Sequence, residues 1–178
     1  MKKIYFLLFT FLLLLNLSCS KDEAPDNEEK LSLTGEWQLE EFKSEGTTAG
    51  RNGDMVDERS YTGTAKDIDI YMVFNEQPDN TWESGGEYTV ELVATVNGEV
   101  QTSEETYSDI LSSGSYSVEE SILKLGYNQT EGALAITEAV ISKLTETELV
   151  LEFEFSETSE VSGYEVELLV KGTQRFSR

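Results

Sequence analysis

Residues 147–156, Thr-Glu-Leu-Val-Leu-Glu-Phe-Glu-Phe-Ser, alternate apolar and charged side chains along most of their length. A period of two is the repeat of a β-strand, in which successive side chains point to opposite faces of the sheet. Strict alternation indicates that one face is buried and the other is in water. The stretch therefore predicts a half-buried strand of an antiparallel sheet.

The same alternation recurs on both sides of this stretch. It is clear in 67–75 and 81–96, and again in 162–176, where Tyr, Val and Leu alternate with Glu. Asn97-Gly98 follows one of these runs and is the strongest short signal for a two-residue hairpin turn. The strands that we expect are 35–43, 67–75, 81–96, 99–107, 114–119, 121–127, 133–143, 147–156 and 162–176.

Short polar segments join most of these runs, which predicts a meander. The expected turns include 77–80, 128–132 and 157–160. An open meander of this length would leave unpaired strand edges, so closure is favoured. We expect an all-β fold, an antiparallel up-and-down barrel of about eight strands, which encloses room for packed side chains or one small ligand.

Two segments depart from the alternation. Residues 44–66 are rich in Gly, Thr and Ser, and a loop of that length in a compact domain is usually functional or disordered. We interpret this segment as a loop that forms a lid at the open end of the barrel. Residues 103–113 fit a strand or a short helix capped by Ser103, and the sequence leaves both open.

The N-terminus has the pattern of a secretory signal. Lys2 and Lys3 precede an apolar run over 4–15, which is shorter than the ~20 residues that span a bilayer. Ser18 and Cys19, the only cysteine, close the run, and this segment resembles the lipobox of bacterial lipoproteins. The resemblance implies that Cys19 is lipidated and anchors the protein in a membrane. We expect the outer membrane, with exposure at the cell surface.

Three parts of the chain follow from this interpretation: a signal peptide over 1–18, an acidic flexible tether over 19–33 and one domain over 34–178. Removing 1–18 leaves 11 basic and 35 acidic residues, a formal charge of -24. A surface with this much negative charge repels nucleic acid, which is itself negatively charged. We expect a monomer whose partners are the membrane, through the lipid on Cys19, and a small apolar ligand.

Composition excludes several kinds of chemistry. The chain has no histidine and no second cysteine, which rules out internal disulfides, Cys/His zinc sites and nucleophile–histidine systems. The acidic pairs Glu152/Glu154 and Glu165/Glu167 alternate with apolar residues, so we expect them on a solvated strand exterior. No calcium-loop or phosphate-loop pattern is present. We predict a protein that is not an enzyme and needs no cofactor or metal.

The first expected strand opens with Gly35-Glu36-Trp37, a G-x-W start. Together with Phe74-Asn75, Trp82-Glu83 and Gly114-Ser115-Tyr116, it resembles the lipocalins and the lipocalin-like lipoproteins of bacterial envelopes over about 35–178. The resemblance implies that Trp37 closes the bottom of an up-and-down barrel. It also implies that Arg175 packs over Trp37.

Two functions remain open. The first is a carrier in which one alternating face lines a ligand cavity. The residues expected to line it are Ile70, Met72, Tyr88, Val90, Leu151, Phe153, Val166 and Leu168. The second is a structural or adhesion protein with a filled barrel, whose outer face meets a partner or a glycan.

Overall fold

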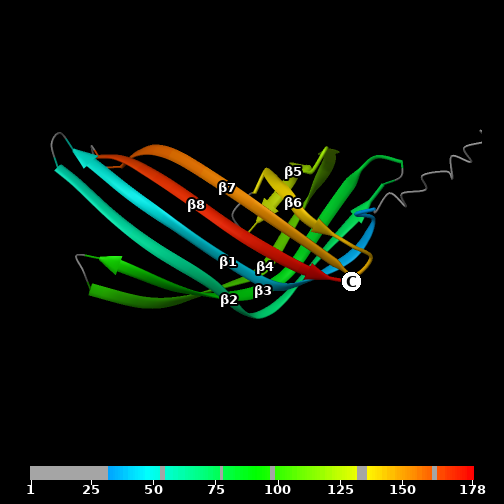
Figure 1. Ribbon diagram of the computed structural model, residues 1–178, viewed down its shortest axis with the longest axis horizontal. Coiled ribbons are helices and arrows are strands. Elements are labelled where there is room, and N and C mark those ends of the chain that lie inside the picture. Colours follow the sequence, from blue (N-terminus) through cyan, green and yellow to red (C-terminus); the bar gives the residue numbers. More distant parts are fainter. Residues whose placement is uncertain (1–31, 53–54, 77, 97–98, 132–135, 162–163) are drawn as a thin grey trace, which may run out of the picture. The chain divides into compact units, whose positions relative to one another are not determined.

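The computed structural model describes residues 32–178 except 53–54, 77, 97–98, 132–135 and 162–163. Each strand pairs antiparallel with the next, and β8 pairs with β1, so the sheet closes into a barrel (Figure 1). The predicted all-β up-and-down barrel of eight strands is confirmed. The strands are β1 Gly35–Asn52, β2 Met55–Asn75, β3 Thr81–Val96, β4 Glu99–Glu119, β5 Ile122–Glu131, β6 Glu138–Leu144, β7 Glu148–Val161 and β8 Tyr164–Ser177.

The predicted loop over 44–66 is wrong. Apart from 53–54, which lie outside the described residues, this segment is strand in β1 and β2. Its glycines make room for neighbouring side chains: a Cβ on Gly46 would lie 2.5 Å from the ring of Tyr61, its partner on β2. An aromatic ring lying over a glycine is a known way to keep such a strand in place. The proposed lid therefore does not exist as a loop.

Other expected boundaries also change. Residues 103–113 are strand, and the two runs 99–107 and 114–119 are parts of one strand, β4. The turn expected at 157–160 lies inside β7, and 128–131 belong to β5. Asn97-Gly98 lie outside the described residues, but the flanking Val96 and Glu99 pair with each other.

One end of the barrel is filled by large apolar side chains. Both tryptophans lie in it, and their indole groups are satisfied: Trp37 donates to Leu33 O at 2.8 Å and Trp82 donates to Gly126 O at 3.2 Å. Leu33, expected in the tether, is thus part of the core. The largest fully buried side chains are Trp37, Trp82, Phe74, Phe176, Leu123, Leu149 and Leu151.

An arginine does cover Trp37, but it is not Arg175. The guanidinium carbon of Arg178 lies 4.1 Å from the centre of the Trp37 ring, and its Nη2 donates to Thr34 O at 2.6 Å. Gly35 has a φ of 123° beside this guanidinium. Arg175 points to the outer face and binds Glu41 at 3.2 Å. The predicted role of Arg175 is wrong, because the adjacent Phe176 occupies the inward position.

Strand length divides the barrel into two parts. β5 and β6 are 10 and 7 residues long, whereas β2 and β4 each have 21. The pairing of β1, β2, β3 and β4 shifts register near the middle of these strands, where bulges bend them. We call the end that contains Trp37 and Trp82 the closed half. The open half consists of 42–52, 55–66, 88–96, 99–107, 153–161 and 164–172.

Candidate binding surface

The eight residues predicted to line a cavity do share one face of the sheet. Ile70, Met72, Val90, Leu151 and Phe153 are buried. The other three, Tyr88, Val166 and Leu168, are half-buried. Directly paired residues on neighbouring strands point to the same side, and the pairing places all eight inward. They do not, however, line one cavity.

The closed half contains a small cavity of about 110 Å³. Four of the predicted residues line it: Ile70, Met72, Tyr88 and Leu151. Its lining also includes Trp82, Leu125, Ala139 and Phe176. Pockets that hold drug-sized ligands are about 300 Å³ or more. The closed half is therefore filled by its own side chains, as the second of the two hypotheses requires.

A chain of aromatic rings separates this cavity from the open half. Phe42 stacks on Phe153 at 6.1 Å between ring centres and meets Tyr88 edge-on at 6.0 Å. Tyr88 in turn stacks on Tyr107 at 5.2 Å. Burial among these rings raises the pKa of the Tyr88 hydroxyl to about 12, and the charge of Glu105 adds to the effect. Phe42 and Tyr88 also line the cavity, so the rings lie at its boundary with the open half.

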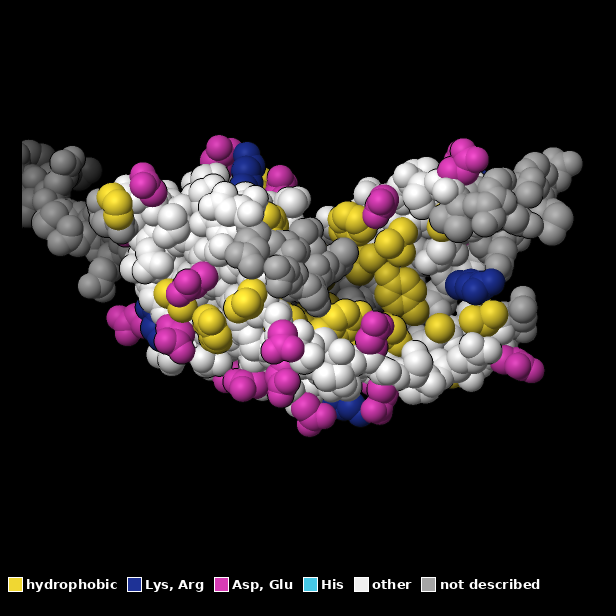
Figure 2. Space-filling model, turned by 180° about the vertical axis from the view of Figure 1, so that it is seen from behind, with side chains coloured by type: hydrophobic (Ala, Val, Ile, Leu, Met, Phe, Trp, Pro, Cys, Tyr) yellow, Lys and Arg dark blue, Asp and Glu magenta, His cyan; other side chains and the backbone are white. Residues whose placement is uncertain are grey.

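The inner face of the open half is mainly apolar in the two rows nearest the closed half, while Glu157 and Arg59 lie in the row beyond them. One row of directly paired residues runs across five strands: Phe155, Val170, Gly46, Tyr61 and Ala94. Phe155 and Tyr61 are half-buried and pack against the core from its edge. Figure 2 shows hydrophobic side chains gathered in a hollow on the face seen from behind.

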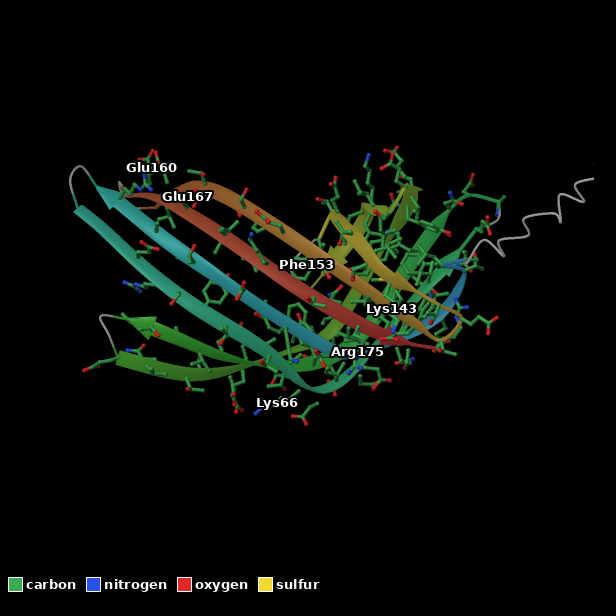
Figure 3. The ribbon with its side chains drawn as sticks, viewed as in Figure 1. Lys66, Lys143, Phe153, Glu160, Glu167 and Arg175 are labelled. Atoms are coloured by element: carbon green, nitrogen blue, oxygen red, sulfur yellow. The ribbon has the colours of Figure 1, made fainter. Side chains whose placement is uncertain are left out.

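A second row lies next to the first, toward the closed half. It consists of Phe153, Gly172, Ser44, Gly63 and Leu92. The ring of Phe153 lies over Gly172, where a Cβ would come within 2.3 Å of it. Phe153 lies halfway along β7, with Glu160 and Glu167 toward the tips of β7 and β8 (Figure 3). The two rows, in which Ser44 is the polar member, form the surface that we call the inner wall.

The outer face of the open half carries two shallow hollows of about 550 and 540 Å³. Glu45, Thr62 and Lys171 line both. Lys171 pairs with Glu154 at 3.1 Å across β7 and β8. Exposed ion pairs of this kind contribute only about 0–1 kcal/mol. The hollows are solvated surface with paired charges, so they make a weaker candidate than the inner wall.

The acidic pairs lie on the outer face. Glu152, Glu154, Glu165 and Glu167 are exposed, as the alternation predicts. Within the described residues, no group of three or more His, Cys, Asp or Glu side chains is placed to hold a metal ion. The same part of the chain contains no helix with the length and hydropathy needed to cross a membrane.

The predicted set missed several aromatic residues of the inner face, among them Phe42, Tyr61, Tyr107 and Phe155. Phe155 continues the alternation of Leu151 and Phe153, so the period of two could have identified it. Tyr61 lies in the Gly-rich segment, and the residues two positions away, Arg59 and Gly63, are not apolar, so no alternation indicated a strand there. Only the pairing of Tyr61 with Gly46 shows where its ring lies.

No protein-family model matches the chain, and no curated protein matches it. Among solved structures, the chain is similar to the crystal structure of Ail, the attachment invasion locus protein of Yersinia pestis. The identity is 10%, the match covers 81% of this chain and 99% of that chain, and the TM-score is 0.25. At that TM-score the likeness carries no argument about function.

Proposed function

We propose that this chain is a non-catalytic, lipid-anchored protein of the outer membrane that works by surface contact with a macromolecular partner. The observation that carries the proposal is the filled interior of the closed half, whose cavity of about 110 Å³ is too small for a carried ligand. The lipobox-like segment at Cys19 supports the anchor. The resemblance to lipocalin-like lipoproteins supports an envelope location, and this location stays a prediction.

Labelling with an alkyne fatty acid tests the anchor. Cells that express the chain should incorporate the label into it, and Cys19→Ala should abolish labelling and release the protein from the envelope fraction. Ser18→Ala serves as a matched control, because it keeps a small residue before the cysteine. An envelope-bound, labelled Cys19→Ala protein would contradict the anchor.

Native mass spectrometry of protein purified from envelopes tests the filled interior. We expect the mass of the lipidated chain with no additional small molecule. Bound ligand that survives purification would favour a carrier instead.

A second candidate is the binding of one amphipathic molecule on the inner wall of the open half. The half-buried Tyr61, Phe155 and Leu168 favour it, because they leave apolar surface accessible. Displacement of a fluorescent fatty acid from the purified protein measures this directly. Binding that is lost in Leu168→Glu would support this second function over the first.

A further inference from the structure

Two strands of the open half have a neighbour on one side only. Within the described residues, β5 pairs with β4 only from Leu111 to Glu119, and β6 pairs with β7 only from Leu149 to Glu152. Residues 99–110 therefore pair with β3 alone, and 153–161 with β8 alone. The backbone N–H and C=O groups on the other side of each edge are available to a further strand.

The two edges differ in the side chains that they present inward. At the end of the β7 edge that is nearer the closed half, the inward residues are Phe153 and Phe155, which begin the two apolar rows. At the same levels on β4 the inward residues are Ser103 and Gln101, paired with Leu92 and Ala94. A strand added to β7 would thus place alternate side chains beside Phe155 and the apolar wall. The β7 edge is the better site for a partner with apolar residues.

Charge decides what kind of chain fits. The β7 edge contains Glu154, Glu157 and Glu160, and 99–110 contains Glu99, Glu104, Glu105 and Asp109. Neither edge contains a lysine or arginine. A second copy would bring acidic edges together, and like charges on neighbouring strands repel. The expected tether is also acidic, with five acids in 20–31, so it is disfavoured for the same reason.

We propose that the edge of β7, residues 153–161, binds an extended segment of a partner protein in which apolar and basic residues alternate. Main-chain hydrogen bonds to β7 would supply affinity, and the side chains would supply specificity. The apolar residues of the segment face Phe153 and Phe155, and its basic residues face outward toward Glu154 and Glu160. Glu157 pairs with Leu168 and lies at an inward position, beyond the apolar rows. This inference rests on the proposed surface contact and names its site and its partner class.

A synthetic nonapeptide of alternating valine and lysine, blocked at both ends, is the probe. Its binding to the lipidated protein purified from envelopes is measured by fluorescence anisotropy at physiological salt. A peptide with glutamate in place of lysine is the charge control, and we expect it to bind at least about tenfold more weakly because it meets like charges. Amide hydrogen exchange locates the contact, and slowed exchange is expected in 153–161.

Variants separate the edge from general attraction to an acidic protein. Ser156→Lys with Thr158→Lys adds two positive charges at exposed, outward positions of β7. The matched control, Ser60→Lys with Thr62→Lys, adds the same charges at exposed, outward positions of β2, which has neighbours on both sides. We expect the β7 pair to weaken peptide binding by about tenfold, and the β2 pair to change it by less than about threefold, since only adjacent like charges repel strongly. Urea unfolding confirms that both variants fold.

Several results would overturn the inference. These are equal weakening by the two variant pairs, slowed exchange at 99–110 instead of 153–161, or no measurable binding of the valine–lysine peptide. Binding of an oligosaccharide panel with slowed exchange at β7 would assign the edge to a glycan and also overturn it. These readouts are independent of the anchor and of native mass spectrometry, so the protein can be an anchored, ligand-free contact protein while this inference alone fails.

Discussion

Gly114 is a position at which one added methyl group should damage the barrel severely. β4 and β5 approach so closely here that a Cβ on Gly114 would lie 1.7 Å from Gly126 O. Cβ contacts below 3.0 Å essentially do not occur, so the two backbones would have to separate by about 1.3 Å. The atom in the way is backbone, which cannot rotate aside as a side chain does. Gly114→Ala must therefore distort the β4–β5 pairing.

The cost can be worked out from the contacts around Gly126. Overpacking of a well-filled site costs about 2 kcal/mol. Gly126 O also accepts the indole N–H of Trp82, and displacing it leaves that buried donor without its partner, at about 1.5 kcal/mol. Gly114→Ala should thus lower the free energy of unfolding by about 3–4 kcal/mol. With a urea m-value of about 2 kcal/mol/M, the midpoint should fall by about 1.5–2 M.

Gly126→Ala, one strand away, is the matched control. Its added Cβ would meet Ser115 Oγ at 3.0 Å, on a side chain that can rotate, and Ser115 O at 3.6 Å, an ordinary contact distance. Gly126 is also exposed. The change in unfolding free energy should stay within about 0.5 kcal/mol. Urea unfolding followed by tryptophan fluorescence measures both variants, because Trp37 and Trp82 are buried. Equal midpoints for the two variants would refute the close-approach argument.

Two further predictions concern the arginine over Trp37 and the buried phenols. Arg178→Ala should lower the free energy of unfolding by about 1–2 kcal/mol, because it loses the contact with Trp37 and the hydrogen bond to Thr34 O. Arg175→Ala loses only an exposed ion pair and should lower it by no more than about 1 kcal/mol. The reverse order in urea unfolding would support the sequence prediction for Arg175. Burial raises the pKa of Tyr88 and of Tyr127 to about 12, so the neutral phenols stabilise the fold fully below pH 10, and that contribution is lost as the pH rises from 10 to 12. The urea midpoint should fall as the pH rises over that range, and it should fall less steeply in Tyr127→Phe, which has one phenol fewer. An unchanged pH dependence in that variant would contradict the assignment to the buried phenols.

The closed barrel was predictable because its core strands repeat with a period of two. The buried Leu151 and Phe153 alternate with the exposed Glu152 and Glu154 in the structure as they do in the sequence. Residues 46–50 of β1 were not predictable in this way, since Gly-Thr-Thr-Ala-Gly carries small side chains on both faces. That segment is held as a strand by its partners, Tyr61 on β2 and Val170 on β8, and pairing is not a local property of the sequence.

The choice of arginine, by contrast, could have been made from the sequence. Phe176 is an inward residue of the last strand, so Arg175 beside it must point outward. Only Arg178, which follows the end of β8, is free of that alternation and can turn back over Trp37. The resemblance to the family motif suggested Arg175, whereas the period of two along the strand places Arg175 on the outer face.

The division of the barrel also separates stability from binding. The seven fully buried large side chains all belong to the filled core, and both indole hydrogen bonds close within it. The outward positions of 153–161 lie on the opposite face of the sheet from these side chains, so charge can be changed there with little effect on the core. A barrel that used its interior for a ligand would have to give up part of this packing. Leaving β5 and β6 short exposes an apolar wall and a strand edge instead, and both can serve a partner while the closed half stays intact.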